Sequence, residues 1–238
     1  MIGKIIKALD NFERNIRNSF GKNISTKSGR FWANVHFQLM DHAFIRIFWN
    51  NFHEISEGVY RANQPSPSHL KSYKKLGIKS VLSLRGRANQ SYDLFEDEYC
   101  KRLGLNLIYT PISSGSAPMP EDLLKIIQVL RELPKPVVLH CKSGADRAGI
   151  MCALYFLLQK KPEIQKAKQQ LSWKYLHIKW AKPGVLDAFV HEYINEYKKN
   201  KIKLLDWVSK KYEPLKLEKN FRSIWWVNRL VDDILKRE

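Results

Sequence analysis

Apolar and polar residues follow one another along the middle of the chain in a pattern that predicts strands separated by helices. The runs expected to form strands are short and apolar, and they cover residues 78–84, 105–109 and 137–140. The expected helices have apolar residues three or four positions apart, and they cover residues 66–76, 92–103, 120–133 and 150–158. This alternation predicts an α/β fold, with a mostly parallel central sheet flanked by helices on both faces.

The ten residues from His140 to Gly149 read HCKSGADRAG and place Cys141 six positions before Arg147. They join the last predicted strand to an apolar helix through a loop that contains Gly144. Such a loop directs backbone N–H groups and the positive end of the helix dipole toward one point. We therefore expect an anion to bind there.

An anion-binding loop also favours the thiolate form of a cysteine, which makes Cys141 a candidate nucleophile. Arg147 offers a planar guanidinium that can hold two oxygens of a phosphoryl group while the thiolate attacks. Two alternatives remain open from the residues alone. Cys141 could be a buried structural thiol beside an arginine that starts a helix, or the loop could belong to a phosphate-binding module without activity.

The H-C-x5-R arrangement resembles the signature of the cysteine-dependent protein tyrosine and dual-specificity phosphatases, close to their bacterial branch. The resemblance implies that Cys141 forms a phosphocysteine, that Arg147 and the loop amides stabilise the transition state, and that water then releases phosphate. It places His140 beneath the loop and implies no metal ion or other cofactor. The residues it assigns to substrate binding are His140, Lys142, Ser143, Gly144 and Ala145.

Two departures from the family pattern concern the proton chemistry. The residue after the arginine, usually Ser or Thr, is Ala148, so breakdown of the phosphoenzyme is expected to be slow. The general acid is usually an Asp about thirty residues before the cysteine, but residues 109–116 contain no carboxylate. Asp146 is the first candidate to replace it, because a loop Asp is a proposed acid in some bacterial tyrosine phosphatases and phosphoinositide phosphatases. Glu121 or Asp122, or no protein acid at all, are the alternatives.

The resemblance covers about residues 57–158, including GVYRANQP and GIKSVLSLRG. We predict a helical extension over residues 1–54, a catalytic domain over residues 55–200 and a second helical extension over residues 201–238. Arg85 and Arg87 follow a strand at the edge where ligands bind in α/β sheets, so they are candidates for substrate contact or solvated loop charges.

The chain carries 41 Lys and Arg against 23 Asp and Glu, a formal net charge of +18 that attracts anionic partners. No zinc-finger, RNP or helix-turn-helix pattern is present, so nucleic acid is not an expected partner. Residues 2–12 and 221–235 have the spacing of amphipathic helices, which suits peripheral contact with an anionic membrane. Packing of these segments on the protein itself is the alternative.

Three cysteines give no disulfide framework, and no signal peptide or membrane span is expected. These features predict a cytoplasmic protein, with the inner membrane face as a peripheral location. His36, Asp41 and His42 lie in an aromatic-rich stretch, but their spacing does not force them together, so no metal site is assigned.

The functional prediction is a phosphatase of the tyrosine or dual-specificity type that hydrolyses phosphomonoesters on phosphorylated protein through a phosphocysteine. Lys142, Asp146 and the basic composition suggest an alternative substrate, a phosphorylated lipid or lipid-linked sugar at a membrane. A catalytically weak phosphate-binding adaptor is the alternative of a different class. The sequence makes no prediction of oligomeric state.

Overall fold

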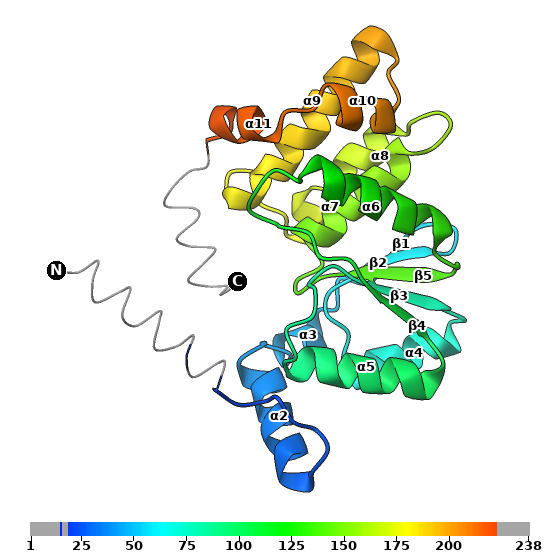
Figure 1. The fold of residues 1–238 in the computed structure, drawn as a ribbon. Coiled ribbons are helices and arrows are strands. Elements are labelled where there is room, and N and C mark those ends of the chain that lie inside the picture. The colour runs from blue at the N-terminus through cyan, green and yellow to red at the C-terminus, as the bar shows by residue number, and fades with distance from the viewer. Residues whose placement is uncertain (1–14, 16–18, 223–238) are drawn as a thin grey trace, which may run out of the picture. The chain divides into compact units, whose positions relative to one another are not determined.

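The computed structural model describes residue 15 and residues 19–222, and its elements are labelled in Figure 1. The predicted amphipathic segment at residues 2–12 lies outside the described residues, as does the one at residues 221–235 apart from its first two residues. Within the described chain, no helix combines the length and the apolar character that crossing a bilayer requires.

A five-stranded sheet forms the centre of the structure and confirms the predicted α/β class. Its strands, in spatial order, are β1 (His53–Ser56), β2 (Val59–Ala62), β5 (Val137–His140), β3 (Ser80–Ser83) and β4 (Asn106–Tyr109). β5 pairs in parallel with β2 on one side and β3 on the other, whereas β1 pairs antiparallel with β2. The edge strand β1 was not predicted, because its residues HEIS do not form an apolar run.

The central strand β5 is buried along its whole length, as a strand covered on both faces should be. The register places His140 opposite Ala62 of β2 and Ser83 of β3. All three residues lie at the carboxyl ends of parallel strands, the edge at which α/β sheets bind ligands. The loop that begins at Cys141 leaves the sheet from this edge.

The contacts divide the chain into two compact units. Among the described residues, unit 1 contains residues up to 50 together with 64–79 and 87–107, and unit 2 contains residues 51–63, 80–86 and 108–222. Unit 2 holds most of the sheet and the helices α6 (Pro120–Glu132), α7 (Asp146–Leu157), α8 (Ile164–Gln169), α9 (Val185–Asn200), α10 (Leu204–Lys210) and α11 (Pro214–Asn220). These units do not follow the predicted linear boundaries, and the boundaries stay a prediction.

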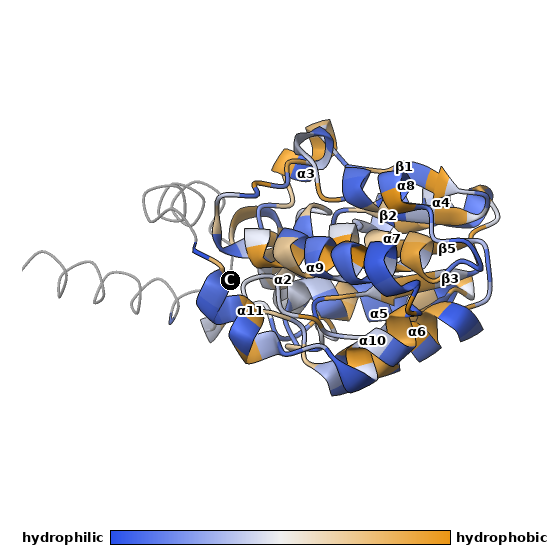
Figure 2. Ribbon diagram, turned by 90° about the horizontal axis from the view of Figure 1, so that it is seen from above, coloured by the Kyte–Doolittle hydropathy of each residue, from blue (hydrophilic) through white to orange (hydrophobic). Residues whose placement is uncertain are grey.

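The core of unit 2 is organised around α7, which is buried on nearly every side, as its apolar sequence predicts. It packs against β2, β5, α8 and α9. Its partner α9 is amphipathic, with alternating orange and blue bands in Figure 2. Because α7 is fixed from several directions, the loop that enters it has a rigid support.

Unit 1 contains α2 (Lys27–Leu39), α3 (Ile45–Phe48), α4 (Pro67–Lys75) and α5 (Ser91–Leu103). α5 packs against both α2 and α4. Helix α4 begins at the predicted Ser66, which caps it, and α5 ends at the predicted Gly104 in the left-handed region. His36 hydrogen-bonds Ser91 at 2.7 Å, so this histidine has a structural partner.

Candidate active site

Cys141 follows β5 directly and begins a loop that ends where α7 starts at Asp146. The Gly144 N–H group donates a hydrogen bond to Cys141 Sγ over 3.2 Å. The sulfur therefore faces the inside of the loop, next to a backbone N–H donor. The start of α7 adds the positive end of a helix dipole to the same place.

Gly144 is required at its position for two reasons. Its φ is +73°, in the left-handed region that favours glycine. A Cβ atom at this position would also lie 2.7 Å from the Ala62 carbonyl group and 2.8 Å from the Asn63 nitrogen. The loop therefore passes so close to the end of β2 that only glycine fits.

A buried arginine, Arg61 of β2, supports this loop from behind. It is 0% exposed, and its Nη2 donates to the carbonyl oxygens of Gly144 at 2.7 Å and Ala145 at 3.1 Å. Its Nη1 donates to the backbone and side-chain oxygens of Gln170, both at 2.9 Å. The guanidinium also lies 3.6 Å from the centre of the Tyr175 ring, a cation–π contact. Arg61 thus fixes the conformation of two loop peptides at once.

The supporting role of Arg61 was not predicted, although Arg61 lies in the motif GVYRANQP that resembles the family. The available signal was a charged residue inside the apolar strand VYRA. A charged side chain in a buried strand needs hydrogen-bonding partners, so Arg61 was a candidate for a buried polar contact. Asn51 gives similar support, because its Nδ2 donates to the Ser143 carbonyl oxygen at 3.1 Å.

Asp146 and two partners outside the loop form a buried chain of charged groups. Asp146 Oδ1 lies 2.8 Å from His177 Nδ1, and His177 Nε2 hydrogen-bonds Asp187 Oδ2. The His177 side chain has no exposed surface. Burial lowers the pKa of His177, but the two carboxylates outweigh burial and raise its pKa to about 9. At neutral pH, His177 is therefore an imidazolium that donates to both aspartates.

The raised pKa of His177 predicts a pH-dependent stability. A group whose pKa is higher in the folded state stabilises the fold below its ordinary value of 6.5, and this contribution is lost as pH rises through about 9. The expected loss is on the order of 3 kcal/mol. Urea unfolding across this range measures it. In Asp187→Asn, with one carboxylate removed, the loss should occur at lower pH, and an unchanged profile in this variant would contradict the assignment.

The predicted loop residues lie between the end of β5 and the first turn of α7. His140 is buried at the end of β5, Arg147 is buried in the first turn of α7, and Lys142 and Ser143 are partly exposed. Ser143 Oγ accepts a hydrogen bond from the Ala145 N–H group at 3.4 Å. The candidate substrate contacts are therefore the partly exposed side chains and the loop amides.

The alternative acids Glu121 and Asp122 lie exposed in the first turn of α6. The helix dipole stabilises carboxylates at this position, so their presence there needs no catalytic role. The loop at residues 109–116, without a carboxylate, precedes Ala117, whose N–H group donates to Glu218 at 2.7 Å. Asp146 is thus the carboxylate nearest in sequence to the reacting groups.

The other two cysteines are buried thiols of a different kind. Burial raises the pKa of Cys152 to about 11 and raises that of Cys100 further. Both are therefore neutral thiols at physiological pH, unsuited to nucleophilic attack. Among the described residues, no cluster of three or more His, Cys, Asp or Glu could hold a metal ion.

Comparison with known proteins places this loop in a family. Residues 48–179, more than half of the chain, match the family model PTP-NADK, described as DSP-PTPase phosphatase fused to NAD+ kinase. The chain is 30% identical over 115 residues to inositol diphosphatase DSP1 of Oryza sativa subsp. japonica, covering 46% of this chain and 50% of that protein. It is 25% identical over 129 residues to the dual specificity protein phosphatase TpbA of Pseudomonas aeruginosa, covering 51% and 53%.

The chain thus spans about half the length of the curated relatives that it matches. Among solved structures, a DUF442 protein from Shewanella putrefaciens CN-32 superposes with a TM-score of 0.51 at 19% identity, covering 62% of this chain and 91% of the other. At this identity the likeness concerns the fold alone, and it agrees with the observed sheet. With its matched region covering the strand, the loop and α7, the chain belongs to the PTP-NADK family of DSP-PTPase phosphatases.

Proposed function

We propose that this protein hydrolyses phosphomonoesters of the tyrosine or dual-specificity type through a phosphocysteine at Cys141. The observation that carries the proposal is the position of Cys141 Sγ inside the loop, where it accepts the Gly144 N–H group at 3.2 Å. Family membership supports the same chemistry.

In the first step the Cys141 thiolate attacks phosphorus, an S–P bond forms, and the P–O bond to the leaving group breaks. The leaving oxygen takes a proton as it departs. In the second step water attacks phosphorus, the S–P bond breaks, and inorganic phosphate and the thiolate are released. Arg147 and the loop amides bind the equatorial oxygens in both steps. Ala148 stands where the family usually has Ser or Thr, and this change favours accumulation of the phosphocysteine formed in the first step.

The source of the leaving group's proton limits the substrates. Residues 109–116 contain no carboxylate, so we propose that the proton comes from the His177 imidazolium and passes through Asp146. The His177 Nδ1 proton moves to the Asp146 carboxylate across their 2.8 Å hydrogen bond, and the carboxylic acid formed in this way gives the proton to the leaving oxygen. His177 is left neutral and takes up a proton from solvent before the next turnover. A leaving group of low basicity, such as a phenol or a phosphate, depends least on this transfer. One relative named above, an inositol diphosphatase, fits a phosphate leaving group by its name.

A comparison of leaving groups tests this proposal. Asp146→Asn is expected to lower kcat/KM by at least about 100-fold for an alkyl phosphate, because an alkoxide needs a proton, and by less than about tenfold for p-nitrophenyl phosphate. The matched control is Asp122→Asn, which should leave both rates unchanged. Equal losses for both substrates would assign Asp146 a structural role, and absence of aryl phosphatase activity in the wild type would contradict the proposed function itself.

A further inference from the structure

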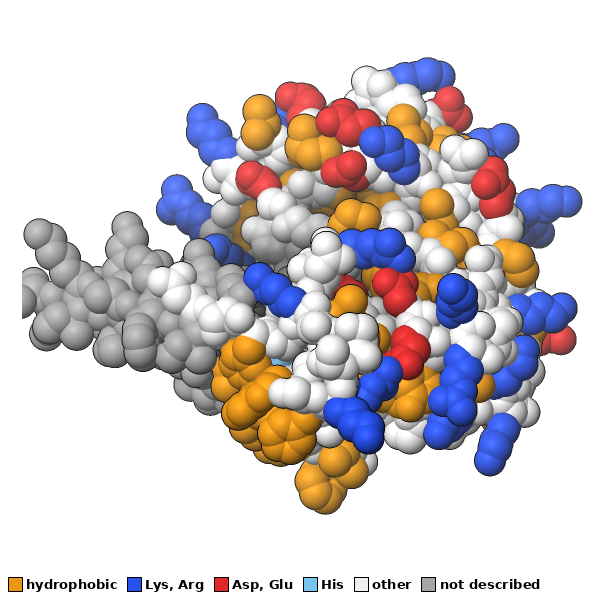
Figure 3. Space-filling view, turned by 60° about the horizontal axis from the view of Figure 1, so that its bottom comes forward, with side chains coloured by type: hydrophobic (Ala, Val, Ile, Leu, Met, Phe, Trp, Pro, Cys, Tyr) orange, Lys and Arg blue, Asp and Glu red, His pale blue; other side chains and the backbone are white. Residues whose placement is uncertain are grey.

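An exposed apolar surface lies on the helices of unit 1. Seven of the fourteen exposed large hydrophobic residues in the described part of the chain fall between residues 31 and 48. They are Phe31, Trp32, Leu39, Phe44, Ile45, Ile47 and Phe48, and we call them the aromatic face. Figure 3, in which the bottom of Figure 1 comes forward, shows hydrophobic side chains gathered at its lower left.

Helix α2 presents apolar residues on two sides. Its Ala33, His36 and Phe37 are buried. Residues 31, 32, 35 and 39 fall within about 100° of one another on a helix and form a second stripe. Within it, Phe31 and Trp32 are 61% and 52% exposed. A helix that only packed on its own unit would carry polar residues there.

Helix α3 also exposes apolar residues, and its charged residue is buried instead. Its single charged residue, Arg46, is buried and forms an ion pair with the buried Asp41 at 2.6 Å. Its apolar Ile47 and Phe48 are 71% and 88% exposed. Exposed patches of this kind mark interaction sites in otherwise soluble folds.

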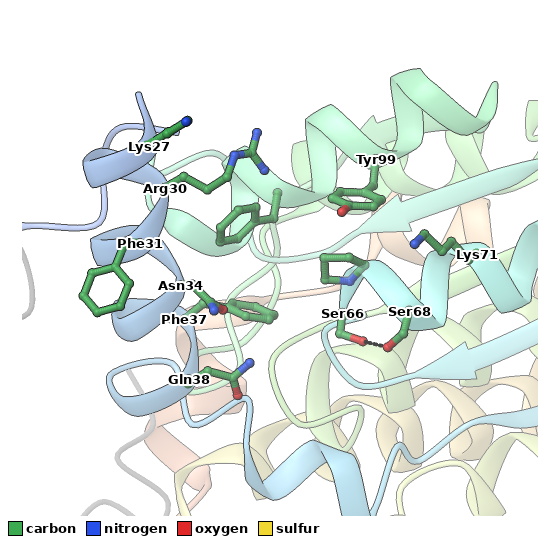
Figure 4. A pocket seen from close by; sticks show the side chains of 12 residues that line it. Lys27, Arg30, Phe31, Asn34, Phe37, Gln38, Ser66, Ser68, Lys71 and Tyr99 are labelled. Atoms are coloured by element: carbon green, nitrogen blue, oxygen red, sulfur yellow. Dashed lines mark hydrogen bonds between the residues drawn. The ribbon is translucent and has the colours of Figure 1, made fainter. Parts of the chain in front are cut away.

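The charges beside the aromatic face are positive. Residues 19–53 contain one carboxylate, Asp41, which Arg46 neutralises, while Lys22 and Lys27 are exposed. Figure 4 shows a pocket of about 560 Å³ whose lining includes Phe31 of the stripe and the cationic residues Lys27, Arg30 and Lys71. Arg30 pairs with Glu98 at 2.6 Å.

We propose that the aromatic face docks on an anionic lipid surface. Aromatic side chains suit the boundary between headgroups and acyl chains, and flanking lysines attract acidic lipids. Every exposed charge between residues 19 and 53 is basic, which favours an anionic surface as the partner. The proposal is independent of the catalytic residues.

Sedimentation of the full chain with vesicles tests the proposal. Wild type is expected to bind phosphatidylglycerol-containing vesicles at least about tenfold more tightly than pure phosphatidylcholine vesicles. Phe31→Ser/Phe48→Ser should weaken binding to the anionic vesicles by about tenfold or more, because two apolar contacts are lost. Lys22→Glu/Lys27→Glu should weaken it through repulsion and reduce its sensitivity to salt.

The matched control is Leu76→Ser/Leu215→Ser, which removes two residues that are 58% and 77% exposed elsewhere. It should bind vesicles as the wild type does, and all variants should hydrolyse p-nitrophenyl phosphate normally without lipid. If Phe31→Ser/Phe48→Ser binds as tightly as this control, or if the wild type ignores anionic vesicles, the proposal is wrong. A change of molar mass in solution caused by the Phe variant, without an effect on vesicles, would instead assign the face to contact between copies of the chain.

Discussion

Cys141→Ser is expected to lower the rate of aryl phosphate hydrolysis by at least about 10⁴-fold. A serine hydroxyl stays protonated at neutral pH, and the loop offers it no general base of the kind that activates serine nucleophiles. Binding should survive, because the loop amides and Arg147 remain. The measurement is kcat with p-nitrophenyl phosphate together with vanadate affinity.

Cys100→Ser is the matched control, since Cys100 is a buried neutral thiol in unit 1. It should cost some stability and little activity. If Cys141→Ser kept a rate within tenfold of wild type, the nucleophile would have to be a different group.

Arg61→Met is expected to damage both the fold and the active site. Methionine fills similar space but leaves the carbonyl oxygens of Gly144, Ala145 and Gln170 without their buried donor. Breaking a buried charged network of this kind costs about 3–5 kcal/mol. Thermal unfolding measures the loss of stability, and KM for p-nitrophenyl phosphate below the unfolding transition measures the disturbance of the loop.

Arg61→Lys separates the two effects. It keeps the positive charge but replaces the planar fork by a single ammonium, which cannot reach both Gly144 and Gln170 in the same geometry. We expect intermediate stability and a raised KM for this variant. Wild-type stability and kcat/KM in Arg61→Met would show that the hydrogen bonds to the loop are not needed.

The sequence was sufficient to predict the central strand of the sheet and the loop that follows it, because both depend on local signals. The apolar run Val137–His140 forms β5 with the predicted bounds, and the loop, the helix α7 and the caps at Ser66 and Gly104 follow from residues adjacent in the chain. Each of these features depends on a few neighbouring residues, namely an apolar run that forms a buried strand, a glycine that allows the turn, and the residues that start a helix.

The supports of the loop could not be predicted in the same way, since they join residues that are distant in sequence. Arg61 meets Gly144 across 83 positions, and Asp146 meets His177 across 31. Neither pairing leaves a periodic pattern in the sequence. The sequence signal in each case is a single polar residue at an apolar position, which identifies a buried polar group but not its partner.

The aromatic face shows a second kind of limit. Apolar residues at helical spacing predict a buried face, and Ala33 and Phe37 of α2 fulfil that prediction. The spacing alone does not distinguish them from Phe31 and Trp32 on the same helix, which are exposed. Only the packing of α2 on its own unit decides which of the two apolar stripes is covered.

Acid quenching during turnover of p-nitrophenyl phosphate, followed by mass spectrometry of the peptide that contains Cys141, tests the central claim most directly. The account predicts one added phosphoryl group on Cys141 in the wild type, with none in Cys141→Ser and no change on the peptides of Cys100 and Cys152. Turnover without any phosphorylated Cys141 peptide, or the phosphoryl group on another residue, would contradict it.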